Sequence, residues 1–187
     1  MDLYPLVVFL HVISDAGVFV AVGATLYGLA ALRQAGRVEQ VRPIVALVLR
    51  AERIYSLAGP LLILSGLFLT LRAWPWTTGW IAAALGSVVL ILPFGPILVS
   101  PRLAAIGRAA DAAPDGPLPA DLLAMIHDPI LGVVQQGVAG VLLGIVFLMT
   151  VKPGLIPSIL VIAGGLALGM ASALPLVRAR ARPRAAS

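Results

Sequence analysis

The sequence predicts an all-α, polytopic membrane protein: a five-helix transmembrane bundle with the N-terminus outside and the C-terminus in the cytoplasm. Three observations predict it. The 187 residues are 60% hydrophobic and only 11% charged, whereas roughly a quarter of the residues in a soluble domain are charged. Several apolar runs reach the length of about 20 residues that spans a bilayer as a helix. The cations are concentrated in alternate connecting segments.

Five spans are expected within a single transmembrane domain, at about residues 4–32, 54–71, 78–100, 129–151 and 155–177. Pro93 and Pro96 predict a kink in the third span, because each proline removes a helical hydrogen bond. Residues 109–121 are rich in Pro, Gly and Asp and predict a loop. A tight turn at residues 152–154 makes the fourth and fifth spans antiparallel neighbours.

Charge predicts the orientation. All but two of the 13 cations fall in segments that share one side of the membrane, and the exceptions are Arg72 and Lys152. The positive-inside rule therefore places the N-terminus outside and the basic tail, residues 178–187, in the cytoplasm. The expected location is the cytoplasmic (inner) membrane of a bacterium, with the lipid bilayer as the main partner. Basic residues arranged in this way indicate topology and not nucleic-acid binding.

Small residues predict close helix packing. The fourth span contains Gly140 and Gly144, and the fifth contains Gly165 and Gly169, both at GxxxG spacing. Such spacing lets two helix backbones approach closely. Packing within the bundle is the simpler interpretation. The alternative is that these glycines mediate self-association or contact with other membrane subunits.

An ionisable pair, His11 and Asp15, lies within the apolar run of the first span. Residues four apart share one helix face, so the two side chains can touch. At 1.5 Å per residue, His11 lies roughly 10 Å and Asp15 roughly 16 Å below the start of the helix, in the outer half of the bilayer. An ionisable side chain at membrane depth is costly and is therefore a candidate functional residue.

Three interpretations of this pair remain open. It is a structural pair satisfied internally or by a neighbouring helix, a haem site, or a proton-relay or small-solute site. In the haem interpretation His11 is the iron ligand and Asp15 orients the imidazole. Met149 supplies the second ligand, or the haem is five-coordinate. Arg72 and Lys152, the outer cations, then lie near the propionates.

The remaining polar residues have structural interpretations. Gln135 and Gln136 are expected to form hydrogen bonds between helices, because an unpaired amide in hydrocarbon is costly. Glu52 and Arg53 are interpreted as an interfacial anchor, and His127 as part of a wetted start to the fourth span. Because His127 lies across the bilayer from the first-span histidine, the two cannot share one iron.

No catalytic residue is predicted. The sequence contains no Ser-His-Asp set, no HExxH and no phosphate-binding glycine loop. It also contains no cysteine, which excludes disulfides, iron–sulfur clusters and thiolate metal sites. These observations weigh against an enzyme without deciding the question.

Several short stretches carry a resemblance to a known family. They are FLHV in the first helix, an arginine-rich first loop, PLLILSGLFLTL with a tryptophan-rich exit, SPRL and VFLMTVKPG. Together they resemble the bacterial integral membrane proteins catalogued as domain of unknown function 2269 (DUF2269), over about residues 4–154. The family has no assigned activity, so the resemblance implies a topology.

The first helix is also similar to those of copper-resistance D-type membrane proteins and J-type protoporphyrinogen oxidases. The second similarity implies that His11 binds haem. Two functions are therefore expected: a membrane subunit that binds haem b or another redox cofactor through His11, or a non-catalytic accessory or assembly subunit of a larger membrane complex.

Overall fold

The structure is a computed structural model that describes residues 2–174. Its elements in chain order are α1 (Tyr4–Gln34), α2 (Val38–Ala73), α3 (Gly79–Ile91), the π-helix η1 (Gly95–Val99), α4 (Ser100–Ala112), α5 (Ala120–Ile126), α6 (Pro129–Val151) and α7 (Leu155–Ser172). The described part of the chain contains no named strand, and its all-α class is as predicted. The end of the fifth predicted span and the basic tail, residues 178–187, lie outside the described residues.

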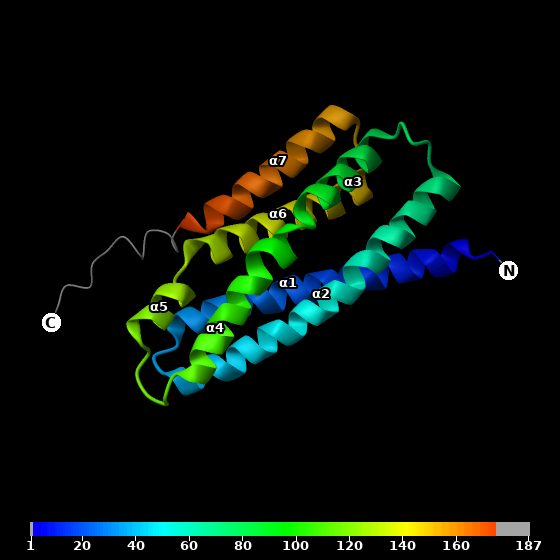
Figure 1. Cartoon of the computed structure of the whole chain (residues 1–187). Coiled ribbons are helices and arrows are strands. Elements are labelled where there is room, and N and C mark those ends of the chain that lie inside the picture. Colours follow the sequence, from blue (N-terminus) through cyan, green and yellow to red (C-terminus); the bar gives the residue numbers. More distant parts are fainter. Residues whose placement is uncertain (1, 175–187) are drawn as a thin grey trace.

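Five segments are long and apolar enough to cross a membrane. Three of them are the single helices α1, α2 and α7. The other two are composite: α3, η1 and α4 form one segment, Gly79–Ala112, and α5 and α6 form another, Ala120–Val151. Figure 1 shows the N-terminus, the α2–α3 connection and the α6–α7 turn at one end of an elongated bundle, with the α1–α2 and α4–α5 connections at the other. We call these the N-terminal end and the loop end.

The third span is interrupted where its prolines predict. α3 ends at Ile91, and η1 follows with Pro96 among its first two residues. The backbone N–H of Ser100 donates to the carbonyl of Gly95, five residues earlier, which is the hydrogen bond of a π-helix. The wide turn therefore changes the direction in which α4 leaves α3, as the break between these two helices in Figure 1 shows.

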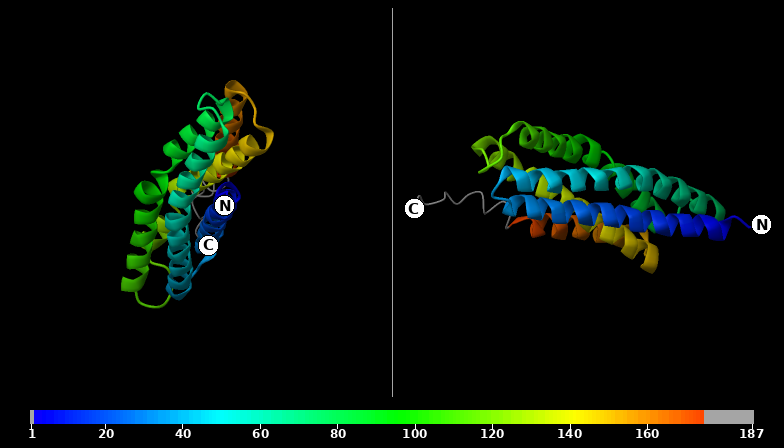
Figure 2. Two further views of the ribbon diagram at one scale, coloured as in Figure 1. Left: turned by 90° about the vertical axis from the view of Figure 1, so that its right-hand side faces the viewer. Right: turned by 90° about the horizontal axis from the view of Figure 1, so that it is seen from below.

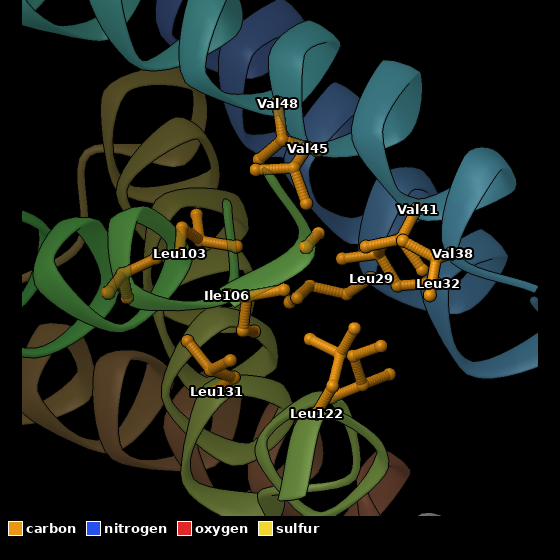
Figure 3. Close-up of a cluster of buried hydrophobic side chains, with 13 residues drawn as sticks. Leu29, Leu32, Val38, Val41, Val45, Val48, Leu103, Ile106, Leu122 and Leu131 are labelled. Carbon is orange, nitrogen blue, oxygen red and sulfur yellow. The ribbon is translucent and has the colours of Figure 1, made fainter. Parts of the chain in front are cut away.

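The loop end holds the apolar cluster that has more buried residues, 13 against 9 in the other. Figure 3 shows valines of α2 meeting leucines and isoleucines of α1, α4, α5 and α6. Its fully covered members include Val38, Val48, Leu103 and Leu122. Arg42 ties the neighbouring loop to this core, since its guanidinium donates to the carbonyls of Ala110 (3.0 Å) and Ala113 (2.7 Å) and pairs with Asp115 (2.5 Å).

α6 and α7 pack backbone to backbone through their glycines, as the simpler interpretation expected. A Cβ atom added at Gly140 would collide with the carbonyl oxygen of Gly165, and one added at Gly165 would collide with that of Gly140. A Cβ at Gly169 would collide with the carbonyl oxygen of Gln136. These glycines therefore form a contact between two helices of the same chain. The two views in Figure 2 show α7 lying along α6 at the side of the bundle.

Candidate functional site

A cavity of about 260 Å³ lies among α1, α2, α3 and α6. It occupies the half of the bundle near the N-terminal end, because Tyr4, Trp74 and Lys152 lie among its walls. Deeper walls come from apolar side chains that include Val88, Leu142 and Ile145. We call it the outer cavity because it lies toward the N-terminal end of the bundle and not at its centre.

The outer cavity brings together four of the five residues that the sequence proposed for a cofactor. His11 and Asp15 line it from α1, Met149 from α6, and Lys152 from the turn that follows α6. The fifth, Arg72, is not among the lining residues. Its guanidinium carbon lies 5.8 Å from the centroid of the Phe68 ring at the end of α2.

Helix α2 holds the imidazole of His11. The Nδ1 atom lies 3.0 Å from the Ser65 hydroxyl oxygen and 3.2 Å from the Leu62 carbonyl oxygen. The single proton of Ser65 is donated to the Leu61 carbonyl at 2.6 Å. We therefore assign the proton between His11 and α2 to Nδ1, which leaves Nε2 with a free lone pair.

Gly66 provides the space for this ring. A Cβ atom at position 66 would lie 3.0 Å from Cε1 of His11, which is closer than carbon atoms normally approach. The pair Ser65 and Gly66 thus both anchors and accommodates the imidazole. Ser65 is only 5% exposed, so this contact lies inside the bundle.

Asp15 is half-buried and lines the outer cavity one turn below His11. Among the described residues no hydrogen bond joins Asp15 to His11 or to any other group. The imidazole is therefore positioned by α2 and not by Asp15, unlike the arrangement that the sequence suggested. The carboxylate is left facing the cavity.

Aromatic residues and one cation border the cavity near the N-terminal end. Lys152 has a left-handed backbone (φ 54°), and its Nζ lies 4.9 Å from the centroid of the Trp74 ring. Trp74 and Trp80 meet edge to face with centroids 5.4 Å apart. The indole N–H of Trp80 is buried and has no hydrogen-bond partner among the described residues.

Glu52 is a candidate that the sequence interpretation missed. The expected interfacial anchor is wrong for this residue, because its carboxylate points into the bundle toward Thr25 and Ser100. Arg53, its neighbour, is exposed. The helical period contained a signal, because Glu52 follows the buried Val45 by seven residues and the buried Val48 by four and so shares their face of α2.

The two glutamines behave differently. Gln136 accepts a hydrogen bond from Ser172 of α7, as expected for a link between helices. Gln135 is 6% exposed and forms no side-chain hydrogen bond within the described residues. At the loop end, Asp128 caps α6 by accepting from the N–H of Ile130 (3.0 Å), and Nδ1 of His127 bonds the Leu123 carbonyl (3.0 Å).

No group of three or more His, Cys, Asp or Glu residues in the described range is arranged to hold a metal ion. The outer cavity therefore offers one imidazole, one thioether, one carboxylate and one ammonium group between apolar walls. Such a set suits an amphiphilic ligand with an iron or polar centre better than a bare divalent ion, which needs several oxygen or nitrogen ligands.

These features define a polytopic α-helical membrane protein with a cavity of about 260 Å³ in one half of its bundle. A family model described as "Predicted integral membrane protein (DUF2269)" matches residues 5–153. The chain therefore belongs to this family, as the resemblance in its sequence predicted. The search of curated proteins and the search of solved structures each found no match.

Proposed function

We propose that this protein is a multi-pass, cofactor-binding protein of the bacterial cytoplasmic membrane whose outer cavity holds haem b through His11. The observation that carries the proposal is the imidazole of His11: its Nδ1 is bonded to α2, which leaves the lone pair of Nε2 unused, and the residue lines the outer cavity. Imidazole is a usual ligand of haem iron. Ligating histidines generally donate their second ring N–H to a carbonyl or a similar acceptor, which fixes the ring.

The other residues of the cavity fit the same group. Met149 offers a thioether as a second ligand, and thioether ligation together with histidine is known for haem iron. The ammonium group of Lys152 suits a propionate carboxylate. Asp15, when ionised, would stabilise positive charge at the iron.

The volume of the outer cavity limits how much of a haem the protein can enclose. About 260 Å³ lies just below the range of roughly 300–1,000 Å³ typical of small-molecule sites. The protein would therefore enclose the iron-bearing part of a porphyrin and not the whole ring. A bound haem b supplies one-electron chemistry, and the chain's own role is to bind it, orient it and exclude water.

The test is an absorbance spectrum of the protein purified in detergent from cells supplied with haem. Because the chain contains only two histidines, it provides its own control. We expect a Soret band in the wild type and in His127→Ala, and its loss in His11→Ala. A folded wild type that stays colourless after incubation with haemin, or a band retained in His11→Ala, would overturn the proposal.

A colourless protein that co-purifies with other membrane subunits would instead favour the accessory or assembly role. The orientation is tested separately, because a chain without cysteine permits single-cysteine labelling. With the N-terminus outside, a membrane-impermeant maleimide labels Thr77→Cys in intact cells. It labels Asp111→Cys only after lysis.

A further inference from the structure

A second polar site lies inside the bundle, and it shares no lining residue with the outer cavity. A cavity of about 10 Å³ is bordered by Glu52, Tyr55 and Gln135 together with apolar residues that include Val22, Ile91 and Val138. That volume is about one water-sized sphere. It can hold one water molecule or one small ion that has lost its water.

The carboxylate of Glu52 is poorly satisfied by the protein. Ser100 donates to its Oε2 at 2.9 Å. Thr25 donates mainly to the Ala21 carbonyl (3.0 Å) and lies farther, 3.4 Å, from Oε1 of Glu52. No ion pair within 4.0 Å involves Glu52 in the part of the chain that the structure describes. An ionised carboxylate with one good hydrogen bond and no counter-charge is costly at this depth.

Gln135 adds a second polar side chain to the same cavity. The residue is 6% exposed and forms no side-chain hydrogen bond with another described residue, so its amide is available to a group in the cavity. An amide left unpaired inside a membrane bundle costs several kcal/mol. A group that accepts an oxygen ligand would therefore be stabilised by both Gln135 and Glu52.

The π-helix η1 contributes Gly95 and Val99 to the lining of this cavity. Gly95 packs against the ring of Tyr55, since a Cβ there would lie 3.7 Å from Cε1, and Ser100 follows η1 directly. Single turns of π-helix are frequently found at functional sites. The wide turn thus sets the position of the hydroxyl that holds Glu52.

From these contacts we infer that Glu52, Gln135 and Tyr55 form a binding site for one sodium ion, and that the hydroxyls of Thr25 and Ser100 position the Glu52 carboxylate. All three lining groups offer oxygen, the ligand atom that hard cations prefer. One carboxylate balances one positive charge. A divalent ion would leave one positive charge unbalanced inside the bundle, because Glu52 is the only carboxylate among the described residues that line this cavity. The inference does not depend on whether the outer cavity binds haem.

The experiment uses the full-length protein in lipid vesicles and the hydrophobic reagent dicyclohexylcarbodiimide, which modifies protonated carboxyl groups. Mass spectrometry measures the rate of modification at each acidic residue. Sodium at the site displaces the proton, so it should slow modification of Glu52 by the factor 1 + [Na⁺]/Kd. Choline at the same ionic strength should not slow it. Asp15, the acidic residue of the outer cavity, is the internal control and should be unaffected by sodium.

Two variants sharpen the test. Glu52→Gln should lose the modification, and Gln135→Leu should keep it but lose the protection by sodium. Modification of Glu52 that depends on pH and not on sodium would overturn the inference. If Glu52 does not react, thermal unfolding decides: sodium should raise the unfolding temperature of the wild type over choline but not that of Glu52→Gln. Absence of that difference would also overturn it.

Discussion

Adding one methyl group at Gly165 tests the backbone contact between α6 and α7. Its Cβ would collide with the carbonyl oxygen of Gly140 and lie 3.1 Å from the carbonyl carbon. Both atoms belong to the backbone, so no side-chain rotation can relieve the collision and the helices must move apart. Overpacking of this kind costs typically 1–3 kcal/mol.

Gly164 provides a matched control on the same helix. A Cβ there meets nothing within 4 Å, whereas the helix propensity changes equally at both positions. That propensity favours Ala over Gly by up to about 1 kcal/mol. We therefore expect Gly164→Ala to be neutral or slightly stabilising. Gly165→Ala should be less stable than Gly164→Ala by about 1–3 kcal/mol, which is the cost of the collision alone.

The assay is denaturant unfolding in mixed detergent micelles, followed by the fluorescence of the chain's three tryptophans. Unfolding free energies of the two variants are compared with that of the wild type under identical conditions. Equal values for Gly164→Ala and Gly165→Ala, within about 0.5 kcal/mol, would refute the packing argument. They would place α7 farther from α6 than the structure does.

Two further outcomes are expected. Arg42→Ala should lower the unfolding free energy by about 1–3 kcal/mol, because it leaves two carbonyls without their charged donor; Arg50→Ala, on an exposed side chain, should change it by less than about 0.5 kcal/mol, and similar losses in both variants would contradict this. Gly66→Ala should displace the His11 ring and reduce haem affinity about 10–100-fold. Gly59→Ala, whose Cβ meets nothing within 4 Å, should leave the Soret band unchanged, and an unaltered band in both variants would contradict the proposed role of Gly66.

The sequence by itself determined the class of the protein, the number of its spans and much of the outer cavity. Apolar runs of bilayer length leave a helical bundle as the available solution, because each backbone polar group must be satisfied within the segment. The break at Pro93 and Pro96 followed from local sequence, as did the loop, although the loop covers only residues 113–119 and not the predicted 109–121, because α4 continues to Ala112 and α5 begins at Ala120. His11, Asp15, Met149 and Lys152 could be grouped because helical rise and span direction assign a depth to each residue.

Only the tertiary structure decided which neighbour each polar group meets. Ser65, and not Asp15, holds the imidazole, because the rotation of α2 about its axis is set by packing against α1 and not by its own composition. The same rotation turns Glu52 into the bundle and away from the interface. Depth follows from position in the chain, but direction around a helix axis follows from contacts between helices. Because the spans are rich in apolar residues on every face, the sequence specifies the depth of a residue far better than the direction in which its side chain points.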